Sequence, residues 1–142
     1  MEVKTNKTEG PPATQHRQRW RFYRSAAGRE PVRDFLDELS EEDAAAVAAA
    51  MKEVRDSGRG HADVNQLRGD IWQLEIDGKR VIYRLLFAEE GRFGQVLLAL
   101  EIVNKKWQSA KSRHIQLAAR RLTDWRARGR RSPPPSTRKP AK

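Results

Sequence analysis

The segment LRGDIWQLEIDGKRVIYRLLF, residues 67–87, carries the pattern that decides the fold. Its first half is an imperfectly alternating apolar run that includes Ile71, Leu74 and Ile76. The pair Asp77 and Gly78 then provides a turn, and a second apolar run extends over residues 80–87. Alternating runs joined by a short turn of this composition are typical of paired antiparallel strands.

Two further segments have the character of strands. Residues 96–103 form a third apolar run after a polar loop at 89–94, which predicts a meander of three antiparallel strands. Near the start of the chain, residues 20–23 are short and rich in aromatic side chains, and a break follows at 25–28. We therefore expect one more strand there.

Two helices are predicted between that first strand and the meander. Pro31 suits the first position of a helix, and apolar side chains follow it at helical spacing. Ser40 is suited to cap a second helix, whose Ala-rich stretch 43–54 has high helix propensity. Gly58 and Gly60 end that stretch. The two helices are expected to form an αα-hairpin.

An amphipathic helix that ends near Gly129 closes the predicted fold. Its apolar side chains recur at helical spacing between basic residues, at Ile115, Leu117, Ala118, Leu122 and Trp125. The order β-αα-βββ-α predicts an α+β protein with a small antiparallel sheet. The N-terminal αα-hairpin and the C-terminal helix are expected to lie against one face of that sheet.

The chain of 142 residues is long enough for one domain. We expect a folded domain over residues 20–128, with a disordered tail at 1–19 and a basic, Pro-rich disordered tail at 129–142. Because there is no cysteine, neither a disulfide nor a thiolate metal site can form. The start of the chain does not resemble a signal peptide, and the longest apolar run has five residues. We expect a cytoplasmic protein with no contact with a membrane.

Positive charge is concentrated in the last third of the chain. Residues 20–103 hold twelve Lys or Arg against sixteen Asp or Glu, a net charge of −4. Residues 104–142 hold thirteen against one, a net charge of +12. A surface of this sign attracts the phosphate backbone of nucleic acids. The alternative is a solubilising tail next to a solvated helix face.

Few residues in the chain suit catalysis. The histidines, His16, His61 and His114, are interpreted as surface residues, and a zinc site is not supported. Cations instead surround the predicted sheet, at Arg68, Arg80, Arg84, Lys105 and Lys106. Arg80 and Arg84 would share a face of the predicted strand over residues 80–87, where they could bind a phosphate together with Lys106. Alternatively, Arg84 pairs with Glu75 across the sheet.

The order of elements and several local motifs resemble the RelE/ParE toxin superfamily, in particular its phage-derived HigB-like branch. The resemblance covers roughly residues 20–128. It rests on LRGD at 67–70, WQLEI at 72–76, YRLLF at 83–87, the lysine pair at 105–106, and a closing basic helix that contains Ala118, Arg120 and Arg121.

This resemblance implies a RelE-like fold and a toxin that cleaves mRNA on the ribosome without a metal or other cofactor. It implies that Arg84 holds the scissile phosphate and that Lys106 stabilises charge on a reacting oxygen. It also implies that Lys105 contacts ribosomal or messenger backbone. Arg68 and Arg80 are further RNA-binding candidates.

The chain departs from the family pattern at several places. Where RelE-type members carry lysines before the Tyr-Arg motif, this chain has Gln73 and Glu75. Glu75 is therefore the candidate base, although nearby cations would weaken it. HigB-like relatives carry a His and a Phe where this chain has Glu101 and Val103. Glu101 would either repel RNA or pair with Lys106.

Other functions remain open within the same fold. ParE-type members inhibit DNA gyrase without cleaving anything, and a degenerate toxin would only bind RNA or its antitoxin. The resemblance implies a cognate helix-turn-helix antitoxin as the partner of a type II toxin. We expect this antitoxin to present an acidic face to the basic C-terminal helix, at Arg120, Arg121, Trp125 and Arg126.

Overall fold

The computed structural model describes residues 18–58, 63–104 and 112–131. In chain order, its elements are β2 (Arg19–Phe22), α2 (Pro31–Asp37), α3 (Glu41–Ser57), β3 (Val64–Arg68), β4 (Ile71–Asp77), β5 (Ile82–Glu90), β6 (Val96–Asn104) and α4 (Ser112–Arg131).

The strands form one mixed sheet of five, in the spatial order β2-β6-β5-β4-β3. Strands β3 to β6 are an antiparallel meander, which contains the three strands predicted from the sequence. The expectation of a purely antiparallel sheet is wrong, because β2 pairs with β6 in parallel. Two helices and three strands separate β2 from β6 along the chain. This connection is long enough for the crossover that a parallel pair of strands requires.

The sequence pattern does not predict strand β3. Only Val64 of its five residues is buried, so the segment lacks the alternating apolar pattern that identifies a half-buried strand. The strand lies at the edge of the sheet, where pairing with β4 on one side holds it in place. A β-bulge between Gln66 and Arg68 interrupts that pairing.

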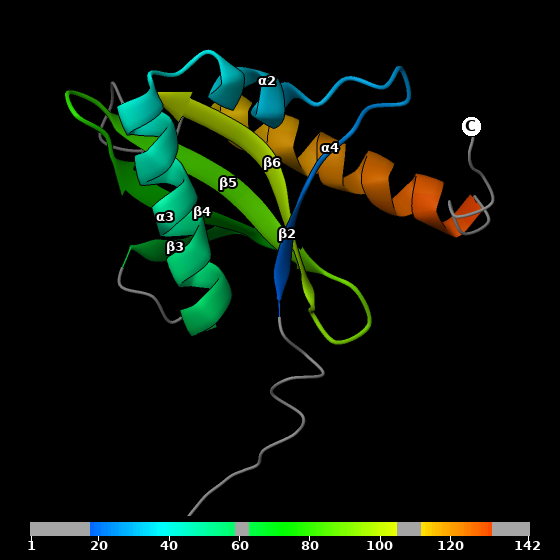
Figure 1. The fold of residues 1–142 in the computed structure, drawn as a ribbon. Helices are drawn as coiled ribbons and strands as arrows, with labels where there is room; N and C mark the ends of the chain where they lie inside the picture. Colours follow the sequence, from blue (N-terminus) through cyan, green and yellow to red (C-terminus); the bar gives the residue numbers. More distant parts are fainter. Residues whose placement is uncertain (1–17, 59–62, 105–111, 132–142) are drawn as a thin grey trace, which may run out of the picture.

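Helices cover both faces of the sheet, not one face as the sequence predicted (Figure 1). On one face, Val47, Met51 and Val54 of α3 pack in a core that includes Leu74, Leu85, Phe87 and Leu97. On the other face, Ala118 and Leu122 of α4 pack with Leu86, Leu98 and Leu100. Strands β5 and β6 lie between the two layers, which explains why their sequences are continuously apolar and not alternating.

The ends of the helices largely follow the expected signals. Pro31 begins α2, and the Ser40 side chain accepts a hydrogen bond from the Asp43 backbone N–H at 3.1 Å to cap α3. Gly58 ends α3 with a positive φ of 79°, a conformation that glycine adopts without steric cost. The last helix continues past Gly129 to Arg131. No helix within the described ranges has the length and apolar content needed to cross a membrane.

Asp43 and Tyr83 join the αα-hairpin to the sheet. The Tyr83 hydroxyl donates a 2.6 Å hydrogen bond to Asp43, whose other carboxylate oxygen accepts from the Lys79 backbone N–H at 2.8 Å. Burial and the bond to Asp43 raise the pKa of Tyr83 to about 12. The same bond lowers the pKa of Asp43.

The raised pKa of Tyr83 predicts how stability changes at alkaline pH. Since the pKa in the folded state exceeds the ordinary value of 10.0, the protonated phenol contributes its full stabilisation below pH 10. That contribution is expected to disappear as the pH rises through about 12. In urea titrations across this range, Tyr83→Phe should lose less stability than the natural chain. An equal loss in both proteins would contradict the role given to this hydroxyl.

Candidate functional site

A group of polar side chains lies on the α4 face of the sheet, toward the end of β6. The pairing of the strands sets Gln73 and Glu101 on either side of Leu86, and Glu75 beside Arg84. Since side chains two apart on a strand share a face, Arg84 lies on the same face as Leu86, which packs in the α4-side core. These residues come from the three inner strands of the sheet.

Arg84 and Glu75 form an ion pair with 3.4 Å between the guanidinium Nη2 and the carboxylate Oε2. Only 4% of the Arg84 side chain is exposed, compared with 34% of the Glu75 side chain. The alternative of a cross-strand pair is therefore confirmed. Arg84 is not an exposed cation on an open concave face, so the partly exposed group at this place is the Glu75 carboxylate.

Gln73 is the second buried polar side chain of this face, with 6% of its surface exposed. Its carbonyl oxygen Oε1 accepts no hydrogen bond from any residue that the structure describes. The Nε of Arg84 on the same face is likewise buried without a hydrogen-bond partner among the described residues. A buried polar atom without a partner is costly, so these two atoms make this part of the face less stable than a fully paired one.

Glu101 connects β6 to two turns of α4. Its carboxylate lies 3.0 Å from His114 Nδ1 and 3.3 Å from Arg121 Nη1. Arg121 also donates a 2.7 Å hydrogen bond to the backbone carbonyl of Leu100. His114 and Arg121 are seven residues apart and therefore lie on one side of the helix, where a single carboxylate can reach both.

A local irregularity in β6 turns Glu101 toward α4. Leu86 pairs with Glu101, but the next residue, Phe87, pairs with Ala99, so Leu100 is an extra residue in β6. Strict alternation from Ala99, which packs on the α3 side, would have placed Glu101 on that side as well. The β-bulge shifts this phase, and Arg121 binds the carbonyl of the extra residue.

The sequence does not predict the contact between Glu101 and His114. Its pattern indicates a surface residue at His114, and the side chain is 23% exposed but contacts Glu101. The available signal was Glu101 itself, since a charge inside the apolar run of β6 requires a partner. The expected alternatives for Glu101 were Lys106 or repulsion of RNA. Its partners among the described residues are on α4.

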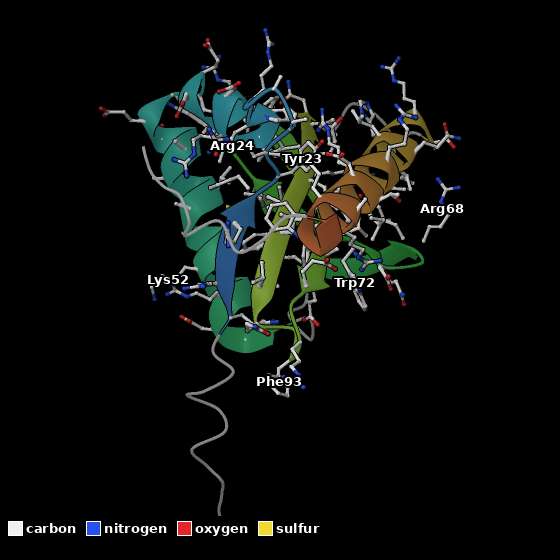
Figure 2. The ribbon with its side chains drawn as sticks, turned by 90° about the vertical axis from the view of Figure 1, so that its right-hand side faces the viewer. Tyr23, Arg24, Lys52, Arg68, Trp72 and Phe93 are labelled. Atoms are coloured by element: carbon white, nitrogen blue, oxygen red, sulfur yellow. The ribbon has the colours of Figure 1, made fainter. Side chains whose placement is uncertain are left out.

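The remaining cations predicted to bind RNA are not brought together with Arg84. Arg68 ends β3 and projects from the edge of the sheet, as Figure 2 shows. Arg80 is exposed and lies in the turn before β5, so the argument that it shares a strand face with Arg84 is wrong. Lys105 and Lys106 follow the end of β6 and lie outside the described residues.

Three of the four side chains predicted to bind a partner have contacts within the fold. Arg121 binds Glu101, and Trp125 packs against the sheet with the Arg21 guanidinium 5.5 Å from its ring centroid. Arg126 forms ion pairs with Glu90 at 2.7 Å and with Asp70 at 3.1 Å, and the bond to Glu90 raises its pKa. Arg120 is exposed.

Within the described ranges, no three His, Asp or Glu side chains come together in a way that would hold a metal ion. The side chains of this face supply several functional groups. They comprise a partly exposed carboxylate, an imidazole oriented by a second carboxylate, and two largely buried guanidinium groups.

Arg84 is expected to support the fold. Arg84→Ala should lower the free energy of unfolding by about 2–5 kcal/mol, as for other large buried side chains, because it leaves a cavity beside Leu86. Arg84→Met should lower it less, because the methionine fills part of that volume. Arg80→Ala, in the exposed turn, is the control and should stay within about 0.5 kcal/mol of the natural chain. Urea unfolding that ranks Arg84→Ala equal to Arg80→Ala would overturn this assignment.

Arg120 and Arg121 are adjacent in sequence but differ in environment. Arg121→Ala should cost about 1–3 kcal/mol of stability, because it leaves the carbonyl of the β6 bulge without its donor. Arg120→Ala removes the same charge from an exposed position and should be nearly neutral. Thermal unfolding of the two variants compares them directly, and equal melting temperatures would show that Arg121 does not hold the bulge.

A family model described as Phage derived protein Gp49-like (DUF891) matches residues 34–123. No curated protein matches the chain. The matched region spans ninety of the 142 residues and includes all four strands of the meander, the Arg84–Glu75 pair and the Glu101–His114 contact. The chain therefore belongs to the phage-derived Gp49-like family, a family of RelE-like, toxin-like proteins.

Proposed function

We propose that this protein is the toxin of a type II toxin–antitoxin pair, within the HigB-like branch, and that it cleaves mRNA on the ribosome. Membership of a phage-derived toxin-like family supports the toxin part of this proposal. The observation that carries the cleavage part is the contact between Glu101 and His114, on the same face of the sheet as Glu75 and Arg84.

Cleavage of RNA by its own 2′-hydroxyl has three chemical requirements. A base must accept the 2′-hydroxyl proton, a cation must stabilise the negative charge that develops on the phosphate, and an acid must protonate the leaving 5′-oxygen. An imidazole performs either proton transfer near neutral pH, and a partly exposed carboxylate accepts a proton when it is ionised.

His114 is the group we assign to proton transfer. With Glu101 bound at Nδ1, the neutral imidazole carries its proton on that nitrogen and leaves Nε2 as an acceptor. This arrangement resembles the use of a carboxylate to hold a catalytic histidine in one tautomer. It also offers a substitute for the family's His at the position of Glu101, with the imidazole supplied by α4.

Glu75 is the second candidate for proton transfer, and Arg84 is its positioning residue. The buried guanidinium holds the carboxylate and adds positive potential beneath it, whereas direct contact with a phosphate would require Arg84 to become exposed. In this proposal, Lys106 supplies the cation that stabilises charge on the reacting phosphate, and Lys105 contacts the RNA backbone. Both follow directly after β6.

The proposed protein partner is a cognate helix-turn-helix antitoxin with an acidic contact face. Arg120 is the exposed residue of the predicted set through which a carboxylate could be recognised without rearranging the toxin. Charge reversal at Arg121 or Arg126 would break internal ion pairs, so Arg120→Glu is the suitable variant for testing antitoxin binding.

Expression of this protein alone is expected to arrest growth. Primer extension on a co-expressed message should reveal new 5′ ends that depend on translating ribosomes. His114→Asn should lower the rate of cleavage by roughly 100- to 10,000-fold, the usual contribution of a general base or acid. Gln116→Ala, at an exposed position on the same helix, is the control and should cleave normally.

The same assays separate the proposal from its rivals. Growth arrest without RNA cleavage, accompanied by inhibition of DNA supercoiling, would replace it with a gyrase inhibitor. Full cleavage by a folded His114→Asn variant would remove His114 from the mechanism while leaving the ribonuclease proposal intact. The absence of both growth arrest and cleavage in the natural chain would contradict the toxin assignment.

A further inference from the structure

A cavity lies between α4 and the segment that connects β2 to α2. It has a volume of about 460 Å³, within the range of small-molecule sites, and is open to solvent. Figure 2 shows Tyr23 where the chain leaving β2 meets α4. The walls are formed by Ser25, Arg29 and Asp34 on one side and by Leu117, Arg120 and Asp124 on the other.

Several of the charges around this cavity neutralise one another. Asp124 accepts a 2.7 Å hydrogen bond from the Tyr23 hydroxyl and forms a 2.9 Å ion pair with Arg128. Burial and the bond to Asp124 raise the pKa of Tyr23, so this hydroxyl remains a donor to Asp124. Arg121, which also lines the cavity, is paired with Glu101.

Two guanidinium groups of the cavity are not neutralised in this way. The side chains of Arg29 and Arg120 are exposed, and neither forms an ion pair with any residue in the described part of the chain. Arg29 is held by a closed turn, in which its N–H donates to Ser25 Oγ at 3.1 Å and its carbonyl accepts from Ser25 N–H at 2.8 Å. The Ser25 hydroxyl proton is available to a ligand oxygen.

The distribution of charge over the molecule favours a polyanion at this place. Residues 30–57, which include α2 and α3, carry nine acidic and three basic side chains. Residues 112–129 of α4 carry five arginines and a single acid, Asp124. The helices α3 and α4 cover opposite faces of the sheet (Figure 1), so these two helical layers carry opposite net charge. A polyanion would be attracted to the α4 face and repelled from the other.

We propose that this cavity binds a backbone phosphate of single-stranded RNA, with Arg29 and Arg120 as the phosphate ligands and Ser25 as a hydroxyl donor. Guanidinium groups bind phosphate oxygens through paired N–H donors, so two that converge from separate segments form a specific clamp. Asp34, also in the wall, adds one exposed negative charge, which the two guanidinium groups outweigh. The choice of RNA as the source of the phosphate rests on the proposed function.

Arg121 joins the cavity to the candidate site, because it lines the cavity and binds Glu101. His114, Leu117, Arg121 and Asp124 recur at helical spacing and form a single stripe. At 1.5 Å per residue, His114 lies roughly 10 Å along the helix from Arg121. A strand anchored in the cavity would therefore extend along α4 to the Glu101–His114 contact, and the clamp would set which phosphate reaches it.

The test is a binding titration of the full-length protein with a short labelled RNA whose 2′-hydroxyls are methylated, so that cleavage cannot occur. The double variant Arg29→Ala/Arg120→Ala should bind this RNA at least about tenfold more weakly. The slope of log K against log salt should fall by roughly 0.7, the value for one lost contact with a single-strand phosphate. The double variant Arg29→Gln/Arg120→Gln keeps more side-chain volume and should behave in the same way.

The control is Lys52→Ala/Arg55→Ala, which removes the same charge from α3, where Lys52 is exposed, Arg55 is half-buried and both are paired with Asp56. It should bind RNA within about twofold of the natural chain. Equal losses in the test and control variants would overturn the proposal, because only net charge would then matter. The proposal would also be overturned if the Arg29/Arg120 variants lost affinity for an acidic antitoxin but kept their affinity for RNA. A third contrary result would be inorganic phosphate that binds in the cavity without weakening the binding of RNA. Because this RNA cannot be cleaved, its binding is measured independently of ribonuclease activity. A failure to cleave mRNA would therefore contradict the proposed function without deciding whether the cavity binds RNA.

Discussion

The fold depends on the burial of β5 and β6 on both faces. Leu85, Leu86, Phe87 and Ala88 are successive residues without exposed surface, so side chains that point in opposite directions both need cover. A single helical layer would leave one set in water at about 25 cal/mol per Å² of apolar surface. The αα-hairpin and α4 therefore lie on opposite faces, although the first lies near the start of the chain and the second near its end. The close packing of Ala118, fully buried on α4, shows how near the last helix approaches the sheet.

Charged groups enter this apolar layer at only a few places, and each has a specific partner. Arg84 is held by Glu75, and Glu101 is held by two side chains of α4. Removing a buried charge from water is costly, and an oppositely charged partner offsets part of that cost. Both pairs lie on the α4 face near the end of β6. The candidate functional groups thus lie where polar side chains enter the sheet. The contacts of Glu101 with α4 both hold that helix and orient the His114 imidazole.

The asymmetry of charge between the two helical layers organises the surface in the same way. The acidic αα-hairpin and the basic α4 face away from each other across the sheet, so an approaching polyanion meets one attractive face. Many arginines of α4 are nevertheless occupied internally, by Glu90, Glu101 and Asp124. Those that remain exposed, such as Arg120, determine what the surface can recognise. Counting basic residues in the sequence overstates that capacity.

The sequence by itself determined the identity of most elements, because their local signals are strong. Pro31 and Ser40 begin helices as expected, Gly58 ends one, and the apolar runs of β4, β5 and β6 are strands paired in the expected antiparallel order. The cross-strand contact of Arg84 with Glu75 also follows from sequence, since opposite charges on neighbouring strands are natural partners.

By contrast, tertiary structure alone decided the parallel pairing of β2 with β6, the formation of the polar edge strand β3, and the separation of the helices onto two faces. It also decided the site, because the extra residue at Leu100 reverses the direction of Glu101 and brings it to His114. Local patterns record propensity and periodicity, whereas a bulge or a pairing between distant segments is selected by the packing of the whole chain.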